Sequence, residues 1–348
     1  MSKKRIGILT SGGDCPGLNA VIRAAVRRAA NDGYASLGFI DGWKGVLAGE
    51  FIPLDVASTN DIIAEGGTIL GTSRTNPYKN PEDVEKVLTT YKDLELDALI
   101  TIGGDDTLGV SDQLHKDHAV NVVGVPKTID NDLSATDYTF GFDTAVNIAM
   151  DAVDRIVTTA RSHHRCLVVE VMGRHAGWIA AYAGMASGAD ITLVPEKPID
   201  MDQVIAVLRR NRERGRDYNI VVVSEGAMFR SGDYVTSYEG EVDEFGHVRL
   251  GGVGNRVAEL VEKHTGYETR GVVLGHLQRG GAPTAFDRVL ATRLGYAAAE
   301  LVVKGEFGKM VALQGNEIVA ADLTDAVGAT KTLDLDFFAV AEAFFTVD

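Results

Sequence analysis

The feature that most constrains the fold is a series of short runs that are apolar almost throughout. Examples are RIGIL (residues 5–9), DALITI (97–102) and CLVVEVM (166–172). A strand with one solvent-facing side would alternate apolar and polar residues, so these runs predict parallel strands covered on both faces. Helical patterns fill the intervals between them. We therefore expect an α/β protein with doubly wound, mainly parallel sheets.

The remaining expected elements fit the same class. Further strands are expected at residues 120–125, 191–194, 220–226 and 271–275. Helices are expected over residues 19–30, 143–161, 178–187, 201–214, 254–264 and 284–304. Residues 310–323 predict a hairpin that turns at Gly315–Asn316, and the polar, acidic stretch 230–250 predicts an exposed loop or hairpin.

Length and charge narrow the function classes. A chain of 348 residues is too long for one ordinary core and suits two lobes. Its net charge of −15 disfavours nucleic acid and anionic membranes as partners, so an anionic substrate needs a local cluster of Arg and Lys.

The two cysteines, Cys15 and Cys166, have neither the spacing of metal ligands nor that of a disulfide framework. The sequence shows neither a signal-peptide pattern nor a membrane-length apolar run, so a soluble cytoplasmic protein is expected.

Five polar, glycine-rich or charged clusters follow five of the expected strands. They are TSGGDCPGLN (10–19), GGDDT (103–107), PKTIDND (126–132), GRHAGW (173–178) and HLQRGG (276–281). Ligands of open α/β sheets bind beyond the carboxyl ends of the strands. One such cluster could be turn chemistry alone, whereas five together predict a binding site.

Two of these clusters suggest phosphate chemistry, and a further glycine-rich stretch does not. The Gly12–Gly13 loop opens a helix, an arrangement that attracts phosphate, although a tight strand-to-helix turn would also need glycine. In PKTIDND, Lys127 could hold a phosphate, while Asp130 and Asp132 could divide the roles of base and cation-orienting group. An Asx-rich capping loop is the structural alternative there. GGTILGTS (66–73) has the glycine spacing of a P-loop but lacks its lysine and a leading strand.

Arginines near two of the clusters could provide local positive charge in a chain whose net charge is negative. Arg165, Arg174, Arg270 and Arg279 flank the last two clusters, and together they favour a phosphorylated sugar as ligand. The histidines of these clusters, at positions 175 and 276, lack metal-like spacing, so hydrogen bonding is expected of them instead.

The order of the motifs resembles the phosphofructokinase family. GGDCPGLNAVIR, GTSR, GGDDT, PKTIDND, FGFDTA, MGRHAGW, SEG and LGHLQRGG follow one another as they do in that family, over roughly residues 5–310. The resemblance implies an enzyme that phosphorylates the 1-hydroxyl of fructose 6-phosphate in a cleft between two lobes. The phosphoryl-donor lobe is expected at residues 1–142 plus about 258–310. The sugar-phosphate lobe is expected at about 143–257 plus 311–348.

The resemblance also implies roles for individual residues. Asp130 matches the general base, Asp132 a supporting carboxylate and Arg174 the arginine that stabilises the transferred phosphoryl group. Lys127 and Thr128 complete the expected catalytic set. The expected donor-binding residues are Gly13, Arg74, Gly104, Asp105, Asp106, Thr107 and Lys127. The expected sugar-phosphate residues are Thr128, Asp130, Arg165, Met172, Gly173, Arg174, Glu225, Arg270, His276 and Arg279.

A cofactor and an assembly are implied as well. Asp105 matches the aspartate that the family links to Mg²⁺, so Mg²⁺ is the expected cofactor. Arg165 and Arg270 match arginines that reach a neighbouring active site across a subunit interface, which implies a homodimer or a homotetramer.

Two positions concern the phosphoryl donor. In relatives that use ATP, the positions of Asp106 and Lys127 are typically glycine. A carboxylate at 106 would repel the α-phosphate of a nucleotide by about 4 kcal/mol at ~4 Å and an effective dielectric of about 20. Lys127 could neutralise pyrophosphate. The pair therefore favours pyrophosphate as donor, in a reversible reaction that serves glycolysis and gluconeogenesis. Asp106 could also simply cap the following helix.

Several alternatives stay open from the sequence. The nearest is an ATP-dependent 6-phosphofructokinase, and a further one is a non-catalytic regulatory subunit that binds a phosphosugar. A lipid or NAD kinase is disfavoured because those classes lack the pair of motifs PKTIDND and MGRHAGW. Sedoheptulose 7-phosphate is a weaker hypothesis for a second acceptor.

Overall fold

The structure is a computed structural model that describes residues 4–230 and 252–345. The chain divides into two compact units and crosses between them several times. Unit 1 comprises Met1–Ile129, Leu133–Asp143 and Arg279–Thr330, and unit 2 comprises Asp130–Asp132, Thr144–Gln278 and Lys331–Asp348. Each unit has its own sheet, and most strand pairs are parallel, which confirms the expected α/β class. No helix in the described ranges is long and apolar enough to cross a membrane.

Unit 1 is built on a seven-stranded sheet with the order β11-β10-β5-β4-β1-β2-β3. The strands are β1 (Arg5–Thr10), β2 (Ala35–Phe39), β3 (Phe51–Leu54), β4 (Ala98–Gly103), β5 (Val122–Pro126), β10 (Lys309–Gln314) and β11 (Glu317–Asp322). Only the edge strands β3 and β11 pair antiparallel. All residues of β4 and β5 are buried, which explains their apolar runs. The hairpin expected around Gly315 is confirmed as β10 and β11.

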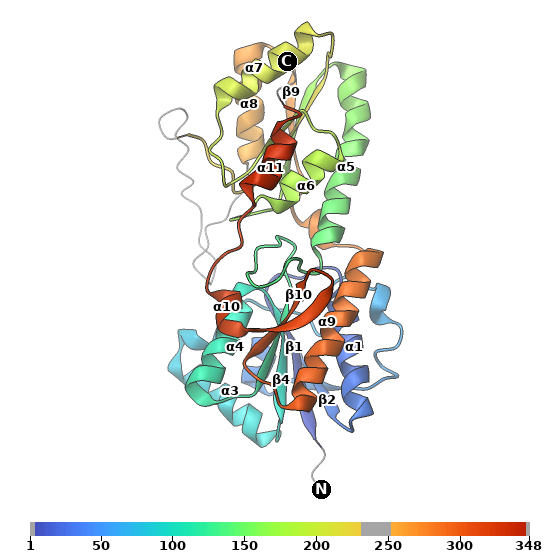
Figure 1. Ribbon diagram of the computed structural model, residues 1–348, viewed down its shortest axis with the longest axis vertical. Coiled ribbons are helices and arrows are strands. Elements are labelled where there is room, and N and C mark those ends of the chain that lie inside the picture. Colours follow the sequence, from blue (N-terminus) through green and yellow to red (C-terminus); the bar gives the residue numbers. More distant parts are fainter. Residues whose placement is uncertain (1–3, 231–251, 346–348) are drawn as a thin grey trace. The chain divides into compact units, whose positions relative to one another are not determined.

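Helices cover both faces of this sheet (Figure 1). The two that pack together on one face are α1 (Leu18–Asn31) and α9 (Ala285–Lys304). A Cβ atom at Gly295 of α9 would lie 2.4 Å from the carbonyl oxygen of Val21, so glycine permits this close approach. The opposite face carries α2 (Trp43–Ala48), α3 (Pro81–Asp93), α4 (Asp105–His118) and α10 (Leu323–Val327), whose apolar side chains pack with those of the strands. Two short 3-10 helices, η1 (Ile62–Ala64) and η2 (Pro77–Lys79), lie between β3 and α3.

Unit 2 is built on a four-stranded, fully parallel sheet with the order β7-β8-β6-β9. Its strands are β6 (Cys166–Val171), β7 (Ile191–Leu193), β8 (Asn219–Ser224) and β9 (Thr269–Val273). One face is covered by α7 (Met201–Glu213) and α8 (Val253–Thr265), and the other by α6 (Trp178–Ala186) and α11 (Leu335–Glu342) (Figure 1). The long helix α5 (Phe142–His163) leads into β6, and the 3-10 helix η3 (Gly275–Arg279) follows β9.

The boundaries of the two units differ from those expected for the two lobes. Residues 258–278 belong to unit 2 because β9 pairs with β6, and residues 311–330 belong to unit 1 because β10 pairs with β5. Hydrogen bonds between strands far apart in the sequence decide both assignments. The loop expected at 230–250 lies, apart from Arg230, outside the described residues.

Candidate functional site

Three of the five clusters meet at one edge of the sheet of unit 1. The strands β4, β1 and β5 are parallel neighbours, with β4 in the centre, so the loops that follow them emerge on the same side. The N–H of Ser11 donates to the carbonyl oxygen of Ile102 at 3.1 Å, and the N–H of Lys127 donates to that of Gly103 at 2.9 Å. These two hydrogen bonds join the loops after β1 and β5 to the end of β4.

The side chain of Lys127 lies against the Gly12–Gly13 loop. Lys127 is only 4% exposed, and its Nζ donates a hydrogen bond of 2.5 Å to the carbonyl oxygen of Gly13. A Cβ atom at Gly12, whose φ of +83° favours glycine, would lie 3.3 Å from that Nζ and 3.7 Å from Oγ1 of Thr107. A buried ammonium group is costly unless acceptors or an anion surround it, so this loop is suited to bind an anion.

Arg279 contacts the same loop at Gly13 and Asp14. A Cβ atom at Gly13 would lie 2.4 Å from NH1 of Arg279, and this NH1 donates to the carbonyl oxygen of Asp14 at 3.1 Å. The sequence assigned Arg279 to the sugar-phosphate residues, whereas the structure brings it onto the glycine loop of unit 1. Gly13 therefore has a guanidinium and an ammonium group as neighbours, which gives a local positive field in an acidic protein.

The loop that carries Arg74 is bonded to the glycine loop. The N–H of Gly12 donates to the carbonyl oxygen of Ser73 at 3.0 Å, and the hydroxyl of Thr72 donates to the carbonyl oxygen of Gly12 at 2.6 Å. Arg74 is exposed and follows directly after these contacts. The 66–73 stretch has no strand leading into it, so the structure agrees that it is not a P-loop.

Helix α4 begins at this edge with two carboxylates. Its N-cap is Gly104, and Asp105 and Asp106 lie exposed in its first turn. The suggestion that Asp106 is the capping residue is therefore wrong, because the helical conformation already starts at Asp105. Both carboxylates still interact favourably with the positive end of the helix dipole. Thr107 is buried, and a Cβ atom at Gly103 would lie 2.3 Å from its Cβ.

The PKTIDND motif straddles the boundary of the two units. Residues 126–129 belong to unit 1, Asp130–Asp132 belong to unit 2, and the chain re-enters unit 1 at Leu133. In unit 1 the hydroxyl of Thr139 donates to the carbonyl oxygen of Thr128 at 2.7 Å. In unit 2 the backbone N–H of Lys331 donates to the carbonyl oxygen of Asp132 at 2.8 Å. The two expected carboxylates thus stand on the short segment that enters unit 2.

A second group of expected residues gathers at the carboxyl edge of unit 2. The N–H of Glu225 donates to the carbonyl oxygen of Val171 at 2.8 Å, and that of Gly226 donates to Gly173 at 3.1 Å. A Cβ atom at Gly226 would lie 1.9 Å from the carbonyl oxygen of Arg174, so only glycine fits between these loops. These contacts bring together the loops that carry Met172, Gly173, Arg174 and Glu225, which are four of the expected sugar-phosphate residues.

One residue of this edge was not singled out from the sequence. Gln278 is fully buried, its Oε1 accepts a hydrogen bond of 3.2 Å from the N–H of Met172, and its Nε2 donates to the carbonyl oxygen of Gly275 at 3.0 Å. It stands inside HLQRGG, between the exposed Leu277 and the half-buried Arg279. No sequence signal identified it, because its contacts depend on the fold; Gln278 links the loops after β6 and β9.

Arg165 and Arg270 lie at the opposite edge of the same sheet. Arg165 precedes β6 and Arg270 is the second residue of β9, and both donate to Oε1 of Glu268, at 2.6 Å and 3.0 Å. The hydrogen bond from Arg165, together with both positive charges, lowers the pKa of Glu268. Six strand residues separate Arg165 from Met172, which is about 20 Å at ~3.3 Å per residue. Within one chain these two arginines therefore do not join the residues at the carboxyl edge.

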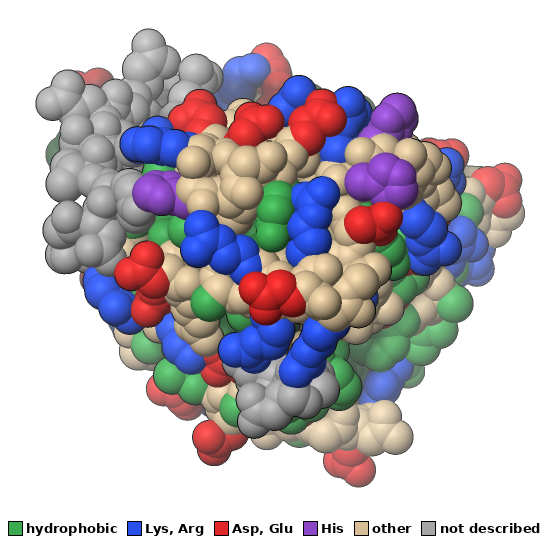
Figure 2. Space-filling model, turned by 90° about the horizontal axis from the view of Figure 1, so that it is seen from above, with side chains coloured by type: hydrophobic (Ala, Val, Ile, Leu, Met, Phe, Trp, Pro, Cys, Tyr) green, Lys and Arg blue, Asp and Glu red, His purple; other side chains and the backbone are tan. Residues whose placement is uncertain are grey.

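The charges around this end of unit 2 are mixed rather than of one sign. Figure 2, seen from the end that bears α7 and α8, shows Lys and Arg side chains interspersed with Asp and Glu. Arg161 and Arg216 stack near the ring of Tyr218, with guanidinium carbons 5.3 Å and 4.7 Å from its centroid, and Arg216 also pairs with Asp190. Many of these basic groups are engaged by partners of their own chain.

Neither cysteine has the properties of a nucleophile. Burial raises the pKa of Cys15 to about 12, against the opposing effect of the Lys127 charge, and burial raises that of Cys166 to about 12 as well. Both thiols are free and stay protonated near neutral pH.

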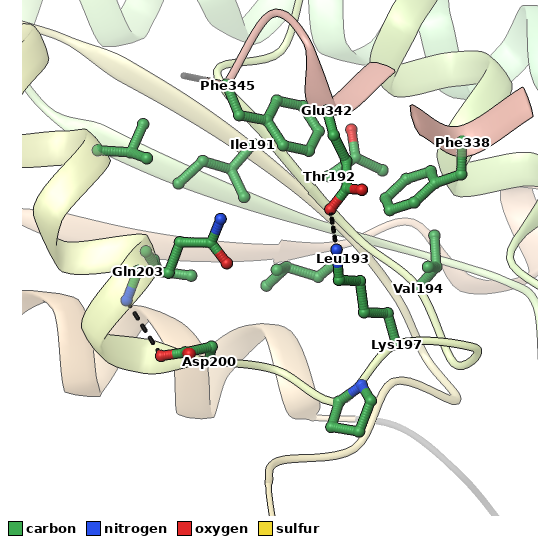
Figure 3. Close-up of a pocket in the computed structure, with 13 residues that line it drawn as sticks. Ile191, Thr192, Leu193, Val194, Lys197, Asp200, Gln203, Phe338, Glu342 and Phe345 are labelled. Atoms are coloured by element: carbon green, nitrogen blue, oxygen red, sulfur yellow. Dashed lines mark hydrogen bonds and ion pairs between the residues drawn. The ribbon is translucent and has the colours of Figure 1, made fainter. Parts of the chain in front are cut away.

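Unit 2 also contains a hollow (Figure 3). It opens between β7, α7 and α11, with apolar walls that include Ile191, Leu193 and Phe338 and with an ion pair between Lys197 and Glu342 at its rim. None of the residues expected from the sequence lines it, so we do not assign the catalytic site there.

Comparisons with known proteins agree with the motifs. Residues 5–302 match the family described as Phosphofructokinase. The chain is 55% identical over 342 residues to the pyrophosphate–fructose 6-phosphate 1-phosphotransferase of Amycolatopsis methanolica, covering 98% of this chain and 99% of that protein. It is 51% identical over 339 residues to the ATP-dependent 6-phosphofructokinase 3 of Streptomyces coelicolor, covering 97% and 99%.

A solved structure shows the same fold. The pyrophosphate-dependent phosphofructokinase of Nitrosospira multiformis superposes with a TM-score of 0.82 at 24% identity, over 100% of this chain and 93% of that one. The family match spans most of the chain, and the two relatives are similar over nearly their whole lengths. The chain belongs to the phosphofructokinase family.

Proposed function

We propose that this phosphofructokinase transfers a phosphoryl group from pyrophosphate to the 1-hydroxyl of fructose 6-phosphate, giving fructose 1,6-bisphosphate reversibly. The observation that carries the choice of donor is the buried ammonium of Lys127, 2.5 Å from the carbonyl oxygen of Gly13. It provides a fixed positive charge at the loop where a phosphate would lie. Arg279 on the same glycine and Arg74 beside the loop add to this charge.

Asp106 supplies the selection against a nucleotide in this proposal. Its carboxylate stands in the first turn of α4, directly after Gly103 and Gly104 at the end of β4. Pyrophosphate ends at its second phosphate, whereas ATP continues into a third phosphate and a ribose. The longer donor would bring further negative charge toward Asp106, and like charges repel one another. Gly104 and Thr107 would offer backbone and hydroxyl donors to the bound phosphate.

The sugar side of the reaction is assigned to the residues of unit 2 and the adjoining motif. Asp130 would accept the proton of the 1-hydroxyl, Asp132 would support it, and Arg174 would stabilise charge on the phosphoryl group in transfer. Thr128 stands beside them on the same motif. The sugar phosphate would be held by Met172, Gly173, Glu225, His276 and Arg279.

Mg²⁺ is the cofactor of the proposal. The described residues contain no group of three or more His, Cys, Asp or Glu side chains arranged as a metal cluster. Mg²⁺ does not require one, since it is usually held by one or two carboxylates together with substrate phosphates and water. Asp105, exposed at the start of α4, fits that requirement. The ion would neutralise phosphate charge during transfer.

A homo-oligomer completes the proposal. Arg165 stands about 20 Å from the carboxyl edge of its own sheet, and Arg270 is paired with Leu167 near the same amino end, so we propose that both serve a sugar phosphate in a neighbouring chain. A homodimer or a homotetramer would provide that neighbour. The proposal also keeps the cytoplasmic location expected from the sequence.

An ATP-dependent enzyme is the second candidate. It is supported by the relatives named as ATP-dependent, which are almost as similar as those named for pyrophosphate, at 51% against 55% identity. A regulatory subunit that only binds the phosphosugar, and sedoheptulose 7-phosphate as a second acceptor, remain weaker candidates.

The activity is tested by product formation. Purified protein is incubated with fructose 6-phosphate, Mg²⁺ and either donor, and fructose 1,6-bisphosphate is measured through coupled cleavage by aldolase. We expect turnover that disappears in Asp130→Asn, a variant that keeps the size of the side chain. A protein that binds fructose 6-phosphate but forms no product with either donor would instead be a regulatory subunit.

A further inference from the structure

The C-terminal segment contacts the short motif that carries the proposed base. The chain enters unit 2 for the last time at Lys331, whose backbone N–H donates to the carbonyl oxygen of Asp132 at 2.8 Å. The side chain of the same lysine reaches the neighbouring residue, and its Nζ donates to Oδ1 of Asn131 at 3.1 Å. Lys331 thus holds the segment Asp130–Asp132 through both its backbone and its ammonium group.

Asn131 stands in a conformation that needs such support. Its φ of +52° lies in the left-handed region, which asparagine adopts less readily than glycine. Asn131 is buried and separates the two carboxylates of the motif, so its backbone angles set the directions of Asp130 and Asp132. A hydrogen bond to its side chain favours the one conformer that the motif requires.

Lys331 is itself fixed by neighbours in unit 2. Its carbonyl oxygen accepts a hydrogen bond of 3.2 Å from Nε1 of Trp178, and its Nζ lies 5.6 Å from the centroid of the Trp178 ring. Two residues further on, the N–H of Leu333 donates to Oε1 of Glu196 at 2.8 Å. The same carboxylate accepts the N–H of Gly177 at 3.0 Å. The segment from 331 to 333 is therefore fastened to the start of α6, just after the GRHAGW loop.

We propose that Lys331 is a positioning residue for the phosphoryl-transfer reaction, acting through Asn131 on the orientation of Asp130. The inference rests on the proposed function, in which Asp130 takes the proton from the sugar hydroxyl. Lys331 does not need to touch the substrate for this role. Its ammonium group restricts Asn131 and thereby selects the arrangement of the two carboxylates in which the base is aligned. Such alignment affects the rate of transfer more than the binding of the sugar phosphate.

The test compares kcat and KM for fructose 6-phosphate in Lys331→Met and Lys331→Arg. Methionine keeps much of the aliphatic stem that lies beside Trp178 but removes the donor, and arginine restores a cationic donor. We expect Lys331→Met to lower kcat by about tenfold or more while KM changes by less than about threefold. Lys331→Arg should recover most of kcat. Lys197→Met is the matched control, since it breaks the ion pair of Lys197 with Glu342 of α11 in the same unit and should leave kcat unchanged.

A double-mutant cycle shows whether the effect passes through Asn131. Asn131→Gly removes the amide but tolerates the left-handed conformation. If Lys331 acts through this amide, the double variant is no slower than the slower single variant, and multiplicative losses would contradict the inference. An active wild type with normal kcat in Lys331→Met would overturn this inference alone. A wild type that is silent with both donors would overturn the proposed function and the inference together.

Discussion

The ammonium group of Lys127 lies 2.5 Å from the carbonyl oxygen of Gly13, although these residues are 114 positions apart in the chain. The contact joins the loop after β5 to the loop after β1, and it places a nearly buried positive charge at the edge of the sheet where phosphate is expected. The account of donor choice depends on this charge and on the carboxylate of Asp106. Five predictions test this contact and other features of the structure.

Lys127→Met should weaken the use of pyrophosphate. A charge-assisted hydrogen bond is worth about 1.5–3 kcal/mol, so kcat/KM for pyrophosphate should fall roughly 10- to 100-fold. The measurement is the initial rate against pyrophosphate concentration at saturating fructose 6-phosphate. Lys116→Met is the control, because Lys116 pairs with Asp112 on α4 and should leave kcat/KM unchanged. A Lys127→Met enzyme with the wild-type value would show that this charge does not serve the donor.

Asp106→Gly should shift the donor preference toward ATP. Removing the carboxylate relieves repulsion of the longer donor, so the ratio of kcat/KM for ATP to that for pyrophosphate should rise at least about tenfold. Asp106→Asn separates charge from size and should give most of the shift. Loss of a negative charge in the first turn of α4 should lower the stability by less than about 1 kcal/mol. A ratio that stays constant in both variants would leave Asp106 with a purely helical role.

Gly13→Ala should damage the site without unfolding the protein. The new Cβ would lie 2.4 Å from NH1 of Arg279, so the guanidinium group must move off the loop. We expect kcat/KM for either donor to fall by about tenfold or more, with little change in the melting temperature. Gly109→Ala is the control, because no atom lies within 4 Å of a Cβ atom at Gly109 of α4. Equal activities of the two variants would contradict the assigned contact.

Mixing two inactive variants should restore activity if Arg165 serves a neighbouring chain. In a dimer formed by random exchange of Arg165→Ala and Asp130→Asn chains, about a quarter of the sites combine intact residues from both chains. The expected specific activity is therefore about a quarter of the wild-type value, measured after the chains are mixed, denatured and refolded together. Activity that stays at the level of the separate variants would place Arg165 outside the site.

Both cysteine thiols should be unreactive in the folded enzyme. Burial raises the pKa of Cys15 and that of Cys166 from 9.0 to about 12, so the folded state disfavours the thiolate relative to the unfolded state. Their contribution to stability is complete below about pH 9 and is lost as the pH rises toward 12. A thiol reagent at pH 8 should detect no reactive cysteine in the native protein and two in urea. Fast reaction of one native thiol would contradict its burial.

The sequence predicted most of the fold because its central strands are buried on both faces. Helix α5 was expected at 143–161 and spans Phe142–His163, and the other long elements agree to within a few residues. The elements β2, α2, β3, α3, α10 and α11 were not predicted. All but α3 are short, with four to eight residues, and the edge strand β3 is mostly exposed and contains Pro53. The longer α3 buries only Val84 and Val87, which gives a weak apolar pattern.

The sequence indicated which loops carry the candidate residues, but not which side chains contact one another there. The rule that ligands lie beyond the carboxyl ends of strands found the loops after β1, β4, β5, β6 and β9. It did not assign Arg279 to the glycine loop, and it did not identify Gln278 or Lys331. Those contacts join residues that are far apart in sequence, and no periodicity or local spacing encodes them. The unit boundaries were missed for the same reason, because β9 and β10 take their partners from distant strands.

The most direct test is a comparison of the two donors on one preparation of the wild-type enzyme. Initial rates are measured with fructose 6-phosphate and Mg²⁺, with pyrophosphate and ATP varied separately, and kcat/KM is obtained for each. The account predicts efficient turnover with pyrophosphate and a value at least about tenfold lower with ATP. Turnover with ATP alone would contradict it, because the Lys127 ammonium and the Asp106 carboxylate would then not determine the phosphoryl donor.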